Sequence, residues 1–151
     1  MKSNNYIKFA SMMLVSFLIM YGVMFLNVDM LGHVMLSTTR TYMSILMVAP
    51  MAVSMLLFMW GMYENKKANY LIISIAVLLF AGTLFMLRNQ ILVDDIQWMK
   101  AMIPHHSSAI LVSQEVDLKD PEAQELARQI IESQQREIAQ MKEMITRLEN
   151  Q

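Results

Sequence analysis

Three long stretches without a charged residue dominate the first half of this chain and restrict how it can fold. The stretches are residues 9–26, 41–63 and 68–87. Each is close to the roughly 20 apolar residues that a helix needs to cross a bilayer. We therefore predict an all-α protein with three transmembrane helices at about residues 7–27, 41–63 and 68–88. Residues 1–93 would form this membrane domain, and residues 94–151 a small helical domain outside the membrane.

Basic residues beside the three spans predict the direction in which the chain crosses the membrane. Four of them fall on one side, namely Lys2, Lys8, Lys66 and Lys67, and two fall on the other, namely Arg40 and Arg88. Since short cytoplasmic loops are enriched in Lys and Arg, this difference places the N-terminus in the cytoplasm. We expect a protein of the bacterial inner (cytoplasmic) membrane, in contact with membrane lipid, with a periplasmic or extracellular C-terminal domain.

The C-terminal domain differs in charge from the membrane domain. Residues 94–151 carry six basic and 11 acidic groups, whereas residues 1–93 carry six basic and two acidic groups. An acidic outer domain argues against binding to nucleic acid and is compatible with a cationic ligand.

Two helices are predicted in the C-terminal domain. The first covers Asp95–Glu115, and the third span has no Gly or Pro at its end that would separate it from this helix. A second helix should begin with Asp120 as its N-cap and Pro121 in its first turn, and should end near Leu148. The short connection between them predicts an antiparallel hairpin. Because one hairpin cannot cover both of its faces, we expect two copies to pair as a four-helix bundle.

Residues equally far from the turn of such a hairpin should face each other. By this rule His105 lies opposite residues 132–134, and the level of Met99 and Met102 matches residues 135–138. Gln134 and Glu137 interrupt the apolar stripe of the second helix at about the level of the two histidines. Polar residues that break a core stripe opposite a histidine pair suggest a binding site.

Two methionines precede two adjacent histidines at helical spacing. Met99, Met102 and either His105 or His106 can therefore line one side of a helix. Thioether and imidazole ligands together favour a soft or borderline metal ion, above all copper. The alternative is that the methionines belong to a core beside a hydrogen-bonded histidine.

The second span carries a row of methionines at every fourth position, which forms one ridge on a helix. The ridge consists of Met43, Met47, Met51, Met55 and Met59. It is a candidate thioether ladder for a monovalent soft ion, but packing between helices is the commoner use of such a stripe. Similarly, Met30, His33 and Met35 could meet around an ion, although a floppy loop at the membrane interface explains residues 27–40 better.

The C-terminal domain resembles a known bacterial family, called domain of unknown function 305. The residues that carry the resemblance are Asp95, Trp98-Met99, Met102-Ile103-Pro104-His105-His106 and Ala109-Ile110, then Leu126, Ile130, Gln134, Glu137-Ile138 and Met141. The resemblance covers about residues 94–148. It implies a ferritin-like helical bundle in an exported or membrane-anchored protein, and some members of the family bind copper or serve in copper tolerance.

Carried over by position, the resemblance also implies a set of metal ligands. These are Met99, Met102, His105, His106 and Met141, with Asp95, Gln134 and Glu137 as supporting groups. The chain departs from the family at Val112, where a methionine is usual. Because valine cannot bind a metal ion, the number of ligands differs from the family pattern if that position faces the site.

The leading hypothesis is a membrane-anchored protein that binds Cu(I) or Ag(I) outside the cytoplasm, with an unidentified copper-handling partner. The alternative is a structural or oligomerisation module whose methionines serve packing only. An enzyme is not expected, because a di-iron oxidase of this architecture needs Glu-x-x-His pairs. Neither His105 nor His106 has a glutamate three residues before it.

Overall fold

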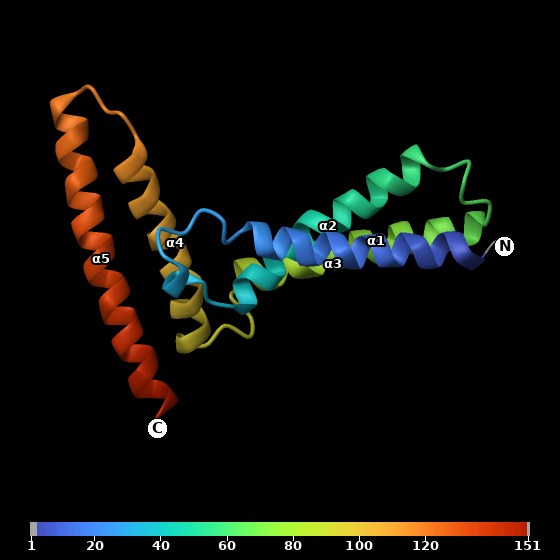
Figure 1. Cartoon of the computed structure of the whole chain (residues 1–151). Coiled ribbons are helices and arrows are strands. Elements are labelled where there is room, and N and C mark those ends of the chain that lie inside the picture. The colour runs from blue at the N-terminus through green and yellow to red at the C-terminus, as the bar shows by residue number, and fades with distance from the viewer. Residues whose placement is uncertain (1–2, 151) are drawn as a thin grey trace. The chain divides into compact units, whose positions relative to one another are not determined.

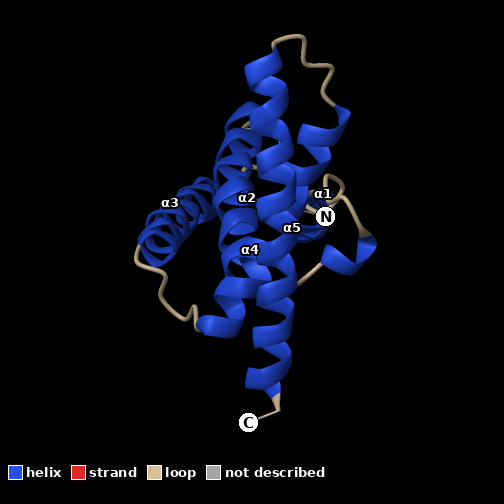
Figure 2. Ribbon diagram, turned by 90° about the vertical axis from the view of Figure 1, so that its left-hand side faces the viewer, coloured by secondary structure: helices blue, strands red, loops and turns tan. Residues whose placement is uncertain are grey.

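The computed structural model describes residues 3–150 of the chain. These residues form helices and loops without a strand, which confirms the predicted all-α class (Figure 2). The elements are α1 (Ser3–Val23), the short 3₁₀ helix η1 (Leu31–His33), α2 (Thr38–Phe58), α3 (Lys66–Arg88), α4 (Asp95–Glu115) and α5 (Pro121–Glu149) (Figure 1).

Helices α1, α2 and α3 belong to a first compact unit, Met1–Met24 with Thr39–Leu92. Three helical segments in it are long and apolar enough to cross a membrane, namely Asn5–Val23, Thr38–Phe58 and Lys66–Arg88. A buried cluster of Phe9, Ala52, Leu56 and Tyr63 connects α1 with α2 and the α2–α3 loop. Side chains from α3 pack against the same cluster, so all three helices contribute to one apolar core.

The second span is shorter at its end than the sequence predicted. Helix α2 ends at Phe58 rather than at residue 63, and residues 59–62 form turns. A network of hydrogen bonds around Asn69 stabilises the chain after this turn. The Asn69 amide is fully buried and donates to the Tyr63 carbonyl over 2.7 Å, while the Tyr6 hydroxyl donates to Asn69 Oδ1 over 2.8 Å.

A break separates α3 from α4, so α3 does not continue into α4, although no Gly or Pro lies between them to stop the helix. Gln90 and Leu92 have positive φ angles of 50° and 59°, which end the helical path although neither residue is glycine. Asp94 then starts the new helix as its N-cap, because its carboxylate accepts a hydrogen bond from the Gln97 N–H over 2.7 Å.

Helices α4 and α5 form an antiparallel hairpin in the second compact unit, Phe25–Thr38 with Val93–Gln151 (Figure 1). Both helix bounds agree with the sequence prediction. Asp120 caps α5 by accepting a hydrogen bond from the Ala123 N–H over 2.8 Å, and Pro121 occupies the first turn as expected.

The register of the hairpin differs from the prediction by more than one helical turn. His106 faces Glu137, whereas a symmetrical turn would bring it opposite residues 131–133. Val116 and Asp120, at the two ends of the connection, are both extended. An extended residue advances about 3.3 Å, roughly twice the rise of a helical residue. The connection therefore carries the start of α5 beyond the end of α4 (Figure 1).

Candidate metal centre

Three methionines of the predicted site lie in the apolar core of the hairpin. Met99 is 1% exposed and Met141 is 6% exposed, and both belong to one cluster with Ile103, Ile138 and Ile145. Half-buried Met102 packs against the same cluster. The shifted register brings these thioethers together, because it moves Met141 from the start of α4 toward the level of the isoleucine core.

His106 lies close to Glu137 on the facing helix. Its Nδ1 atom is 3.1 Å from Glu137 Oε2, and the two side chains are 12% and 49% exposed. The contact lacks the geometry of a hydrogen bond, so Nδ1 is a buried polar atom without a hydrogen-bond partner among the described residues. A buried polar atom without a hydrogen-bond partner destabilises the fold.

Helical spacing places this pair beside the thioethers. Met102 precedes His106 by four residues on α4, and Glu137 precedes Met141 by four residues on α5. Since His106 faces Glu137, the two methionines lie one turn away from them on the same sides of their helices. Thioether, imidazole and carboxylate groups thus occur within two helical turns of one another along the hairpin.

The remaining residues of the predicted set are less enclosed. His105 is exposed, with its ring centre 6.1 Å from that of His106. Asp95 is exposed in the first turn of α4, and Gln134 is half-buried one turn before the Ile138 level. Within residues 3–150, no three His, Cys, Asp or Glu side chains form a metal-binding group, so any metal site would depend on the methionines.

Val112 faces away from the methionine cluster. It is 58% exposed and lines a shallow groove near the turn, together with Val116, Leu118 and Leu126. The absence of the usual family methionine at this position therefore removes no side chain from the cluster.

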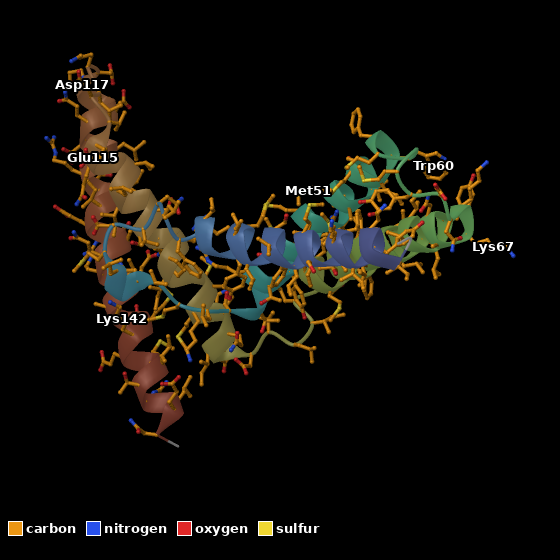
Figure 3. All side chains as sticks on the ribbon, turned by 45° about the vertical axis from the view of Figure 1, so that its right-hand side comes forward. Met51, Trp60, Lys67, Glu115, Asp117 and Lys142 are labelled. Atoms are coloured by element: carbon orange, nitrogen blue, oxygen red, sulfur yellow. The ribbon has the colours of Figure 1, made fainter. Side chains whose placement is uncertain are left out.

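The methionine ridge of α2 is not a uniform surface. Met43 is 41% exposed, while Met55 and Met59 pack against the core of the first unit. Met51, which is labelled in Figure 3, lines a hollow with Met12, Met13 and Met55. Met59 lies one residue past the end of α2.

The loop between α1 and α2 has defined partners, in contrast to the floppy segment expected from its sequence. Buried Ser107 accepts a hydrogen bond from the Asp29 N–H over 2.8 Å, and its hydroxyl lies 2.9 Å from His33 Nδ1. Asn27 donates to Ser108 over 2.7 Å. Sequence reasoning missed these partners, because Ser107 and Ser108 have no pattern that links them to a loop about 75 residues earlier.

Burial keeps both enclosed histidines neutral. Desolvation lowers the pKa of His33, and nearby Lys142 lowers it further, while Asp29 opposes the change. Desolvation also lowers the pKa of His106, against the opposing charge of Glu137 and with a smaller lowering effect of His105. A neutral imidazole offers a ring nitrogen that can bind a metal ion near neutral pH.

The lowered pKa values of His33 and His106 predict an acid-sensitive hairpin unit. The unfolded chain binds these protons more readily, so the stabilising effect is complete above the ordinary pKa of 6.5 and decreases as the pH falls below it. Hydrogen exchange of α4 and α5 peptides should therefore accelerate between about pH 7 and about pH 5.5, after correction for the intrinsic rate. The variant His33→Asn should show a weaker pH effect, and an unchanged profile would contradict this assignment.

Comparison with known proteins identifies the family of this chain. Residues 87–145 match the family described as Domain of unknown function (DUF305). The chain is also 35% identical over 137 residues to uncharacterized protein L153 of Acanthamoeba polyphaga mimivirus, covering 89% of this chain and 88% of that protein. No solved structure shows a significant match. The match to the viral protein is too long to be confined to the hairpin, so it includes most of the apolar helices. The chain belongs to the DUF305 family.

Proposed function

We propose that this protein is a membrane-anchored, non-enzymatic metal-binding protein that takes up Cu(I) or Ag(I) at its hairpin, as in copper tolerance. The observation that carries the proposal is the pairing of His106 with Glu137 beside three thioethers. Thioethers and imidazole are soft to borderline ligands, which select Cu(I) over the hard cations Mg²⁺ and Ca²⁺.

Each residue of the cluster would have a defined part in binding. Met99 and Met141 offer neutral sulfur ligands that are buried from water, and half-buried Met102 offers a third. His106 offers a ring nitrogen, and the nearby Glu137 carboxylate would orient that ring by accepting a hydrogen bond from it once the ion is bound, as a carboxylate commonly does behind a ligating histidine. Since the bound ion carries a positive charge, the Glu137 carboxylate also offsets the cost of placing it near an apolar core.

The membrane setting is proposed from the three apolar helices and the distribution of basic residues. We propose that the protein lies in the bacterial inner membrane, with its N-terminus in the cytoplasm. A reporter enzyme fused after Gln151 should be active only on the outer side of the membrane. A second fusion in the loop at Glu64 provides the opposite control, and activity of the Gln151 fusion in the cytoplasm would contradict this topology.

The turn end of the hairpin has an exposed apolar face that suits a second copy. Val112, Val116 and Leu126 are 50–58% exposed and line one groove with Leu118 and Ile130. Pairing of two hairpins into a four-helix bundle would cover this face. Mass measurement in nanodiscs should show at least a dimer for the wild type and monomers for Leu126→Glu. Gln114→Glu, an exposed change on α4, serves as the control, and a monomeric wild type would contradict the pairing.

A structural module remains the second candidate, because Met99 and Met141 are packed like ordinary core residues beside three isoleucines. In that case the hairpin would serve oligomerisation, and its sulfur atoms would bind no metal ion.

A titration of Cu(I) against a competing chelator distinguishes the two functions. We expect the full chain in nanodiscs to bind Cu(I), with no competition from Mg²⁺ or Ca²⁺. Binding should weaken in Met102→Leu, which removes a sulfur at nearly constant volume, and in the His105/His106 double alanine variant. Val112→Met adds a thioether to α4 outside the cluster and should leave binding unchanged. Equal binding by all four proteins would exclude this site and favour the structural module.

A further inference from the structure

The segment Phe25–Thr38, which consists of the α1–α2 loop and the first residue of α2, is hydrogen-bonded to α4 at two places. At the first place, Asp29 and His33 are bonded to Ser107. At the second, Gln97 Oε1 accepts hydrogen bonds from the backbone N–H and the hydroxyl of Thr38, over 2.8 Å and 3.0 Å. The residues between His33 and Thr38 are therefore held against the hairpin from both ends.

The first of these attachments is fully enclosed. Ser107 is 0% exposed and His33 is 7% exposed. The Ser107 oxygen accepts from the Asp29 N–H, so its own proton is available to donate to Nδ1 of neutral His33. Breaking this arrangement would leave several buried polar atoms unpaired, which makes the position of the loop specific.

Met35 lies between the two attachments and reaches the methionine cluster. It is half-buried and packs against the core that contains Met99 and Met141. It also lines an open groove of about 560 Å³ with Lys100, Lys142 and Ile145. Lys142 belongs to α5 (Figure 3), so Met35 lies at the edge of the cluster where both hairpin helices meet the groove.

We propose that Met35 is a further thioether ligand of the soft monovalent ion, supplied by the loop rather than by the hairpin. This inference rests on the proposed function and extends the site beyond residues 87–145, the part that matches the family. Met35 is the cluster methionine that borders the groove, and its unbranched side chain has three rotatable bonds with which it can turn toward an ion.

The test compares two methionines of the same loop in the full chain in nanodiscs. Met35→Leu should weaken binding of Ag(I), measured against a competing chelator, by about tenfold or more. Met30→Leu is the matched control, because Met30 is 59% exposed and is not among the side chains packed on the cluster. In wild-type protein with ¹³C-labelled methionine methyl groups, the Met35 resonance should shift with the same Ag(I) stoichiometry as that of Met102.

The outcomes separate this inference from the function on which it rests. If Met102→Leu weakens binding while Met35→Leu does not, and the Met35 resonance stays in place, Met35 serves packing and the inference is overturned. If wild-type protein binds no Ag(I), both the inference and the proposed function fail. Weaker binding by Met35→Leu together with a shifted Met35 resonance supports the loop ligand.

Discussion

Replacing Ile103 with alanine should destabilise the hairpin unit by about 2–5 kcal/mol, the usual cost of deleting a large core side chain. Ile103 is 0% exposed and lies in the cluster with Met99, Ile138, Met141 and Ile145. Its truncation would remove apolar contacts with both hairpin helices and leave a cavity that the helices can fill only in part.

Fluorescence of Trp98 during urea unfolding measures this effect. The chain has two tryptophans, so a Trp60→Phe background leaves Trp98 on α4 as the only reporter. Gln114→Ala, an exposed change on the same helix, should alter the free energy of unfolding by less than about 0.5 kcal/mol. If Ile103→Ala changed the free energy of unfolding as little as Gln114→Ala does, the core of the hairpin would not be where the structure places it.

Replacing Met99, Met102 and Met141 together with leucine should weaken Cu(I) binding by about 1,000-fold, equivalent to about 4 kcal/mol. Leucine keeps nearly the same volume and apolarity, so the hairpin should still fold with an unfolding free energy within about 1.5 kcal/mol per site of the wild-type value. The expected loss is therefore a loss of sulfur ligands and not of structure.

The matched control for this variant is a triple change in the methionine ridge, Met47, Met51 and Met55 to leucine. It removes the same number of thioethers from the first compact unit and should leave the affinity unchanged. If the ridge variant loses binding and the hairpin variant does not, the ion binds among the apolar helices and the proposed site is wrong.

Local signals in the sequence were sufficient to predict the helices of the hairpin. Asp120 and Pro121 determine the start of α5, because a carboxylate can accept from a free N–H and proline needs no donor in the first turn. The three apolar helices followed from the absence of charge over about 20 residues. These features depend on neighbours in the sequence, so they could be predicted without knowledge of packing.

Features that depend on tertiary structure could not be predicted in the same way. The register of α4 against α5 depends on the extended path of the connection. A count from a symmetrical turn placed His105 opposite residues 132–134, whereas its neighbour His106 lies beside Glu137. The break before Asp94 depends on two positive φ angles at residues that do not usually adopt them.

The loop contacts depend on packing in the same sense. Nothing in the sequence distinguishes Ser107 from other helical serines, and only the folded structure shows its contacts with Asp29 and His33. For the candidate site, the sequence supplied the residue types and the fold supplied their grouping. Met99, Met102 and Met141 are clustered, His106 is enclosed with Glu137, and His105 is exposed.

X-ray absorption at the copper edge of the Cu(I)-loaded full chain tests the central claim most directly, because it identifies the atoms bound to the ion. We expect a first shell dominated by sulfur with one nitrogen neighbour, and a strongly reduced sulfur signal in the Met99/Met102/Met141 triple leucine variant, which keeps only the sulfur of Met35 among the proposed ligands. A shell of oxygen and nitrogen alone in the wild type, or an unchanged sulfur shell in the variant, would contradict a thioether site in the hairpin.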